Sequence, residues 1–250
     1  MRNKDLRNKL NLSVLNVTEQ DYFAGFFELP SLACPYDDKL LIDYIALYQD
    51  VKEYRKTART AICFYAYDNV WNGRFGLYQS IYFDDKKKLS FFRERFKSSD
   101  GKPMIFIEPD VSQISVAGKI ENLHRYYEAR VISLWLILEC NALVIPNLTA
   151  ADRTYFPIMI QGLEATEIAA ISVKGHLMDE DELSFSLEMA KYASLHLPKL
   201  KLLVVFTTSI HRAEIGGLFA SVVKKTIKVI VPKNRANERN LCLSERRKAK

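Results

Sequence analysis

The sequence is poor in the residues that build special scaffolds. It has only four cysteines in 250 residues, and they form neither a Cys-x-x-Cys pair nor a Cys/His cluster. This excludes a disulfide-rich fold and gives no support for a zinc site. Glycine (nine) and proline (eight) are too scarce for a fibrous or low-complexity chain. With 48% apolar and 26% charged residues, the composition is that of a globular protein able to bury a sizeable core.

Long apolar stretches and several well-known motifs are also missing. No segment approaches the ~18–20 consecutive apolar residues that a membrane span needs. The chain begins with charged residues rather than an apolar signal segment, so we expect a soluble, cytoplasmic protein without membrane contact. The motifs G-x-x-x-x-G-K-[ST], G-x-G-x-x-G, H-E-x-x-H and G-x-S-x-G are all absent. Their absence argues against P-loop NTPases, Rossmann dehydrogenases, zinc peptidases and ordinary α/β-hydrolases.

The net charge of +6 is concentrated at the two ends of the chain. Residues 233–250 carry a net charge of +5 and residues 1–10 carry +3, so the remaining 222 residues are close to neutral at −2. A basic segment that is poor in apolar residues usually stays solvated and disordered, which is the interpretation we favour for 233–250. Such a segment can also bind nucleic acid through its phosphates.

Apolar runs alternate with helical patterns along the chain. Continuous apolar runs of strand length occur at 61–67, 103–107, 142–145, 168–173, 201–206 and 228–231. Apolar residues at three-to-four-residue spacing predict helices around 37–51, 89–96, 118–140, 155–162, 183–195 and 211–223. A further strand is expected around 23–29.

These patterns predict an α/β fold. Strands that are continuously apolar, rather than alternating, are typical of parallel strands covered on both faces, with helices as crossovers. No linker divides the chain, so we expect one domain over 1–232, followed by the basic tail 233–250. A (β/α)-barrel-like arrangement is favoured, and an open doubly wound sheet is the alternative.

Several strand ends resemble those of one known family. The segments are Phe64-Tyr65-Ala66-Tyr67-Asp68 with the nearby Trp71, Ile107-Glu108-Pro109-Asp110-Val111-Ser112, Asn122-Leu123-His124-Arg125 and Val144-Ile145-Pro146-Asn147. In order and spacing they are similar to the domain-of-unknown-function family numbered 4417, common in phages and mobile elements, over roughly residues 61–207. Val111 stands where the family has an aromatic residue, and residues 147–149 replace a Trp-bearing stretch. The resemblance implies an α/β architecture and a mobile-element setting, but no activity.

Polar residues follow the predicted strands where ligands bind in parallel α/β folds. The candidate catalytic residues are Asp68, Asp110, Asn147, Lys174 and His176. Three acids, Asp68, Glu108 and Asp110, are suited to Mg²⁺ or Mn²⁺ coordination or to general acid–base work. Glu108 is the weaker member, because side chains along a strand alternate between its two sides. The competing interpretation is that Asp110 only caps the following loop or helix, and that Lys174 and His176 are exposed loop residues.

Two functions from different classes follow. The first is an enzyme whose site, at the C-terminal ends of the strands, acts on a phosphorylated or nucleotide-like small molecule, with Mg²⁺ or Mn²⁺ as a candidate cofactor. The second is a non-enzymatic accessory protein that binds nucleic acid through its basic ends, above all 233–250, or binds another protein. The sequence leaves the reaction and the oligomeric state open.

Overall fold

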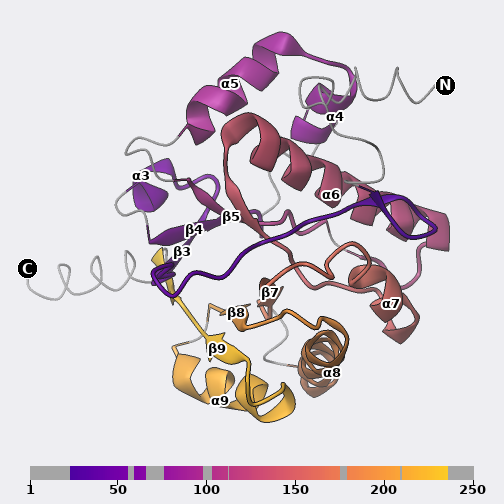
Figure 1. Ribbon diagram of the computed structural model, residues 1–250, viewed down its shortest axis with the longest axis vertical. Coiled ribbons are helices and arrows are strands. Elements are labelled where there is room, and N and C mark those ends of the chain that lie inside the picture. The colour runs from indigo at the N-terminus through magenta and orange to yellow at the C-terminus, as the bar shows by residue number, and fades with distance from the viewer. Residues whose placement is uncertain are drawn as a thin grey trace, which may run out of the picture.

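The computed structural model is a mixed α/β fold with parallel strands, as the sequence predicts (Figure 1). It describes residues 23–55, 59–65, 76–97, 103–111, 113–174, 179–208 and 210–235. No helix within these ranges is long and apolar enough to cross a membrane.

The parallel strands form two sheets. The larger has the order β10-β3-β4-β5-β6 and contains β3 (Tyr44–Leu47), β4 (Thr60–Cys63), β5 (Ile105–Ile107), β6 (Leu143–Ile145) and β10 (Lys233–Asn234). The smaller has the order β7-β8-β9 and contains β7 (Ile168–Ser172), β8 (Leu202–Phe206) and β9 (Lys228–Ile230). The predicted continuous apolar runs from 61 to 231 therefore correspond to β4 to β9. In β4 to β8, burial on both faces explains why these runs do not alternate with polar residues.

The two sheets share one apolar interior. A bridge between Asn147 and Ala170 links the end of β6 to β7, and only two residues separate β9 from β10. Side chains from β3 to β8 meet in a single buried cluster, which includes Ile45, Cys63, Ile107, Ile145, Ala170 and Val204. The hydrogen-bonded ladder is interrupted at these two junctions, so the open alternative fits and a closed barrel stays a prediction.

Helices cover the outer faces of both sheets. The helices are α3 (Val51–Tyr54), α4 (Leu77–Tyr82), α5 (Lys86–Phe96), α6 (Lys119–Cys140), α7 (Phe156–Met159), α8 (Glu180–His196) and α9 (Arg212–Val222), with a 3₁₀ turn at Arg153–Tyr155. The first four gather beside β3, β4 and β5, and the last three beside β7, β8 and β9 (Figure 1). The predicted helices at 89–96, 118–140, 183–195 and 211–223 are confirmed.

The predicted helix over 37–51 is wrong. This region contains strand β3 and the start of the short helix α3. Asp37 accepts a hydrogen bond from the Lys39 backbone N–H at 2.9 Å and closes a turn, not a helix. Tyr44–Leu47 pairs along its length with β4, and these sheet hydrogen bonds outweigh a periodicity that a short strand can mimic by chance.

The N-terminal strand prediction is also corrected. Phe23–Ala24 (β1) and Leu29–Pro30 (β2) form their own antiparallel pair and join neither parallel sheet. Leu29 packs instead in the core beneath α6, α7 and α8. Two parallel strands are missing from the sequence-based list: β3, hidden inside the expected helix, and β10, hidden inside the expected tail.

The boundary of the basic tail moves by at least two residues. Lys233 and Asn234, assigned above to the tail, form β10 and pair with the start of β3. Residues 236–250 lie outside the described residues, so the predicted disorder of the tail stays a prediction.

Candidate functional site

A cavity of about 650 Å³ opens at the C-terminal ends of β4 to β7. Its lining comes from the segments that follow these strands and from the first turns of α8. The lining residues are Tyr65, Asp110, Gln113, Asn147, Leu148, Thr149, Ala150, Ala151, Ser172, Lys174, Asp181, Glu182, Phe185 and Met189. The cavity therefore lies at the strand ends where the sequence predicts a ligand site.

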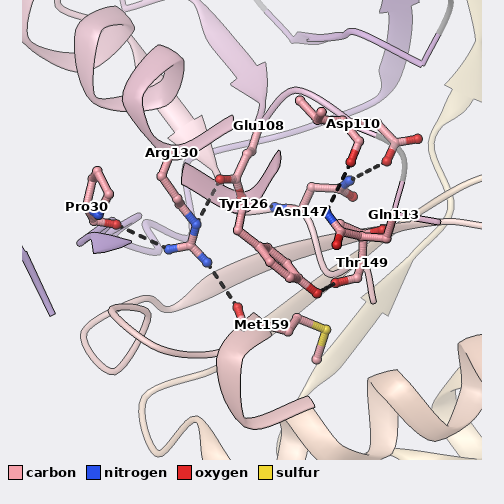
Figure 2. A network of polar contacts seen from close by, with 10 residues as sticks. Pro30, Glu108, Asp110, Gln113, Tyr126, Arg130, Asn147, Thr149 and Met159 are labelled. Carbon is pink, nitrogen blue, oxygen red and sulfur yellow. Dashed lines mark hydrogen bonds and ion pairs between the residues drawn. The ribbon is translucent and has the colours of Figure 1, made fainter. Parts of the chain in front are cut away.

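Asn147 is held on three sides. Its backbone N–H donates to Glu108 Oε2 at 2.9 Å, and its side-chain Oδ1 accepts from the Tyr65 hydroxyl at 2.9 Å. Its Nδ2 donates to Asp110 Oδ1 at 3.5 Å (Figure 2). A carboxylate can only accept from an amide nitrogen, and a hydroxyl can donate to an amide oxygen, so both neighbours favour the same amide orientation. The Asn147 carboxamide is thus fixed by contacts within the protein.

The Tyr65 hydroxyl remains a donor over the physiological pH range. Tyr65 is buried, and this burial is the main reason why its pKa lies well above the ordinary value. The nearby carboxylates of Asp110 and Glu108 raise the pKa further, since a tyrosinate beside them would be repelled. The ring of Tyr65 stacks on Phe206 of β8 with ring centroids 4.7 Å apart, which anchors it across the apolar interior.

Behind the cavity, Glu108 pairs with Arg130 of α6. The Arg130 Nε lies 2.9 Å from Glu108 Oε1, and the two side chains are only 2% and 3% exposed. The guanidinium also donates to the carbonyl oxygens of Met159 and Pro30 (Figure 2). Burial raises the pKa of the Glu108 carboxyl, while Arg130 and the Asn147 N–H oppose that shift. This buried pair joins the end of β5, the middle of α6, the end of α7 and strand β2 behind Asn147.

Lys174 extends from the end of β7 toward the end of β4. Its Nζ donates to the Tyr65 carbonyl oxygen at 3.1 Å, and its backbone N–H donates to Ser172 Oγ at 3.3 Å. An ammonium group has three N–H donors, so this contact leaves Lys174 able to bind an anionic ligand group.

The outer wall of the cavity is the beginning of α8. Asp179 caps this helix by accepting from the backbone N–H groups of Asp181 and Glu182. The side chains of Asp181 and Glu182 line the cavity, and Phe185 lies one turn further along. The lining that the structure describes therefore includes three carboxylates and one ammonium group.

The structure brings together three of the predicted site residues. Asp110, Asn147 and Lys174, from the ends of three successive strands, line the same cavity. Asp68 and His176 lie outside the described residues. Whether any of these groups is catalytic stays a prediction.

Glu108 has a different role from the predicted metal ligand. It shares the helix-facing side of β5 with Phe106, because side chains two apart in a strand point the same way. Its carboxylate is committed to Arg130 and to the Asn147 N–H, away from the cavity lining. Within the described ranges, no group of three His, Cys, Asp or Glu side chains is arranged to hold a metal ion.

Sequence reasoning missed the other polar wall residues. Asp181 and Glu182 look like ordinary acidic residues in the first turn of a helix, where they complement the helix dipole. Only the packing of α8 places them over the strand ends. Tyr65 could have been found, because it closely follows β4, as Asp110 and Asn147 follow β5 and β6.

Comparison with known proteins gives no relative. No family model matches the chain, and no curated protein or solved structure matches it. The resemblance to the family numbered 4417, and the mobile-element setting that it implies, therefore stay hypotheses.

Proposed function

We propose that the protein is an enzyme that binds a phosphorylated or nucleotide-like small molecule in the cavity at the C-terminal ends of β4 to β7. The observation that carries this proposal is the convergence of Asp110, Asn147 and Lys174 on one cavity of about 650 Å³. A volume of this size is ordinary for a small-molecule site. Convergent polar groups on a rigid sheet edge are what acid–base chemistry requires.

Each of the three residues has a role that its surroundings support. Asp110 is the proton acceptor, since its carboxylate lies in the cavity wall beside the amide of Asn147. Asn147 orients the ligand by hydrogen bonding, because Tyr65 and Glu108 already fix its position. Lys174 is the cation that receives a phosphate, because it is the basic member of the described lining.

The charge of the lining narrows the ligand further. The carboxylates of Asp110, Asp181 and Glu182 repel a bare phosphate and favour hydroxyl or amino groups that donate hydrogen bonds. A nucleotide-like molecule carries both kinds of group, with its phosphate at Lys174 and its sugar or base toward the acids. Mg²⁺ or Mn²⁺ bound to the phosphate would offset the remaining repulsion.

The test is thermal melting with a panel of nucleotides and sugar phosphates, each paired with its unphosphorylated counterpart. A ligand at a hundred times its Kd should raise the Tm of the wild type on the order of 5–10 °C. We expect the phosphorylated member of a pair to give the larger shift, and Mg²⁺ or Mn²⁺ to increase it. Asp110→Ala should fold normally but lose the shift and any turnover.

Two further variants make the test specific to the cavity. Lys174→Gln should remove the preference for the phosphorylated member of each pair. Glu214→Gln on α9, an exposed acid outside the cavity, should behave as the wild type. The proposal fails if Asp110→Ala keeps the full response, if both members of each pair stabilise equally, or if no compound raises the Tm.

A further inference from the structure

A second charged region lies at the opposite ends of the strands. The loops that lead into β8 and β9, together with the first residue of β9, contain five exposed lysines: Lys199, Lys201, Lys224, Lys225 and Lys228. The two loops are about 25 residues apart in the sequence, with α9 between them. They come together because β8 and β9 are neighbouring parallel strands.

Backbone hydrogen bonds hold these lysines in place. The Lys228 N–H donates to the Lys201 carbonyl at 2.8 Å, and Lys228 lies directly beside Leu202 in the sheet register. The turn before β9 is closed by the Ile227 N–H, which donates to the Lys224 carbonyl at 2.9 Å. The lysines therefore project from a rigid edge.

Most of this positive charge is not neutralised locally. Glu167 is the acid that pairs with one of these lysines, and its Oε1 lies 2.6 Å from the Lys201 Nζ. Its other oxygen accepts from the Tyr36 N–H at 2.7 Å. No acidic side chain in the described ranges forms an ion pair with Lys224, Lys225 or Lys228.

The basic C-terminal segment begins beside the start of β3. Lys233 pairs with Tyr44 at the start of β3, and the Arg235 guanidinium lies 3.3 Å from the centre of the Tyr44 ring. The chain then continues into 236–250, which carries a net charge of +3. Lys233 and Arg235 thus add positive charge beside the start of β3, five and seven residues beyond Lys228 along the chain.

We propose that this edge binds the phosphate backbone of nucleic acid without reading its sequence. Lysines held a few residues apart on a rigid edge match a linear polyanion, and releasing counterions from its phosphates drives such binding. A protein partner would need an apolar centre to its interface. Among the described residues, no large exposed apolar side chain lies in the loops 198–201 and 224–228. The surface is separate from the cavity and does not depend on the function proposed for it.

The experiment is a salt titration of full-length protein on a random-sequence duplex DNA, followed by fluorescence anisotropy. The slope of log Kobs against log salt counts the phosphates contacted. The triple variant Lys224→Gln/Lys225→Gln/Lys228→Gln should bind more weakly at every salt concentration. Its slope should be smaller in magnitude by about 3, or about 1 for each lysine removed.

The matched control is Lys86→Gln/Lys87→Gln/Lys88→Gln in the first turn of α5, which changes the net charge equally. The control should keep the wild-type slope. The proposal is overturned if both triple variants lose binding equally, since net charge alone would then explain it. It is also overturned if the wild type does not bind DNA, or if poly-glutamate of equal charge competes as well as unlabelled duplex.

Discussion

At the C-terminal ends of β4, β5 and β6, Tyr65, Glu108 and Asn147 are buried and bonded to one another, whereas at the N-terminal ends of β8 and β9 the charged side chains extend into solvent. Asn147 has partners on three sides, and Lys225 has none among the described acids. The first arrangement fixes side-chain atoms, as the proposed small-molecule site requires. The second leaves lysine side chains in solvent, as the proposed contact with nucleic acid requires, so one parallel fold presents two kinds of surface.

The ion pairs of the two edges show the same contrast. Glu108 and Arg130 are almost fully buried, while Lys201, which pairs with Glu167, is 53% exposed. A buried charge that loses its partner has no water to replace it, so breaking such a pair costs about 3–5 kcal/mol. An exposed pair is screened by solvent and contributes about 0–1 kcal/mol.

The largest expected effect is therefore on folding stability. Glu108→Gln leaves Arg130 buried and unpaired, and should lower the free energy of unfolding by about 3–5 kcal/mol in a urea titration. Lys201→Gln, at the other edge, should lower it by less than about 1 kcal/mol. Equal free energies of unfolding for the two variants would contradict the contrast drawn between the buried and the exposed ion pair.

A double variant separates the pair from general damage. Glu108→Gln/Arg130→Met removes both charges and should recover part of the loss, because no unpaired buried charge remains. A double variant that loses the sum of the two single losses would show that the ion pair is not the cause.

The next effect concerns the basic C-terminal segment. Arg246→Gln/Arg247→Gln/Lys248→Gln in the full-length chain should reduce the salt slope of DNA binding by up to about 3, because three cationic groups are lost. An unchanged slope would restrict the contact to the folded edge. Deleting 233–250 is unsuitable for this test, because Lys233 and Asn234 belong to β10.

The last prediction concerns the slow alkylation of two buried thiols, one near each edge. Burial is the main cause that raises the pKa of Cys34 and of Cys63 to about 12. At pH 8 the reactive thiolate should then be roughly three orders of magnitude scarcer than for a free cysteine. Iodoacetamide should label both residues only after unfolding, as mass spectrometry can measure. Rapid labelling of either residue in the folded protein would contradict the burial described here.

Local sequence signals were reliable where an element is long or buried on both faces. Helix α6 repeats its apolar side chains over 22 residues, and β8 is an uninterrupted apolar run. The signal failed at β3, whose four residues are too few to distinguish period 2 from period 3.6. It failed again at β10, where only pairing with β3 distinguishes a strand from a basic tail.

The candidate site likewise contains some residues that the sequence predicts and others that it does not. Asp110, Asn147 and Lys174 could be listed from the sequence, because each follows a strand and parallel strands end at one edge. Asp181 and Glu182 could not, because their place in the wall depends on the direction in which α8 packs.

The sequence by itself determined the α/β class, most of the strands and the polar residues at their ends, since hydrophobic period and strand direction are local properties. The tertiary structure decided how Glu108 is used, which acids line the cavity and how lysines about 25 residues apart form one edge. These outcomes depend on contacts between segments distant in the chain. Burial, ion pairing and the register of neighbouring strands set those contacts, and no local pattern records them.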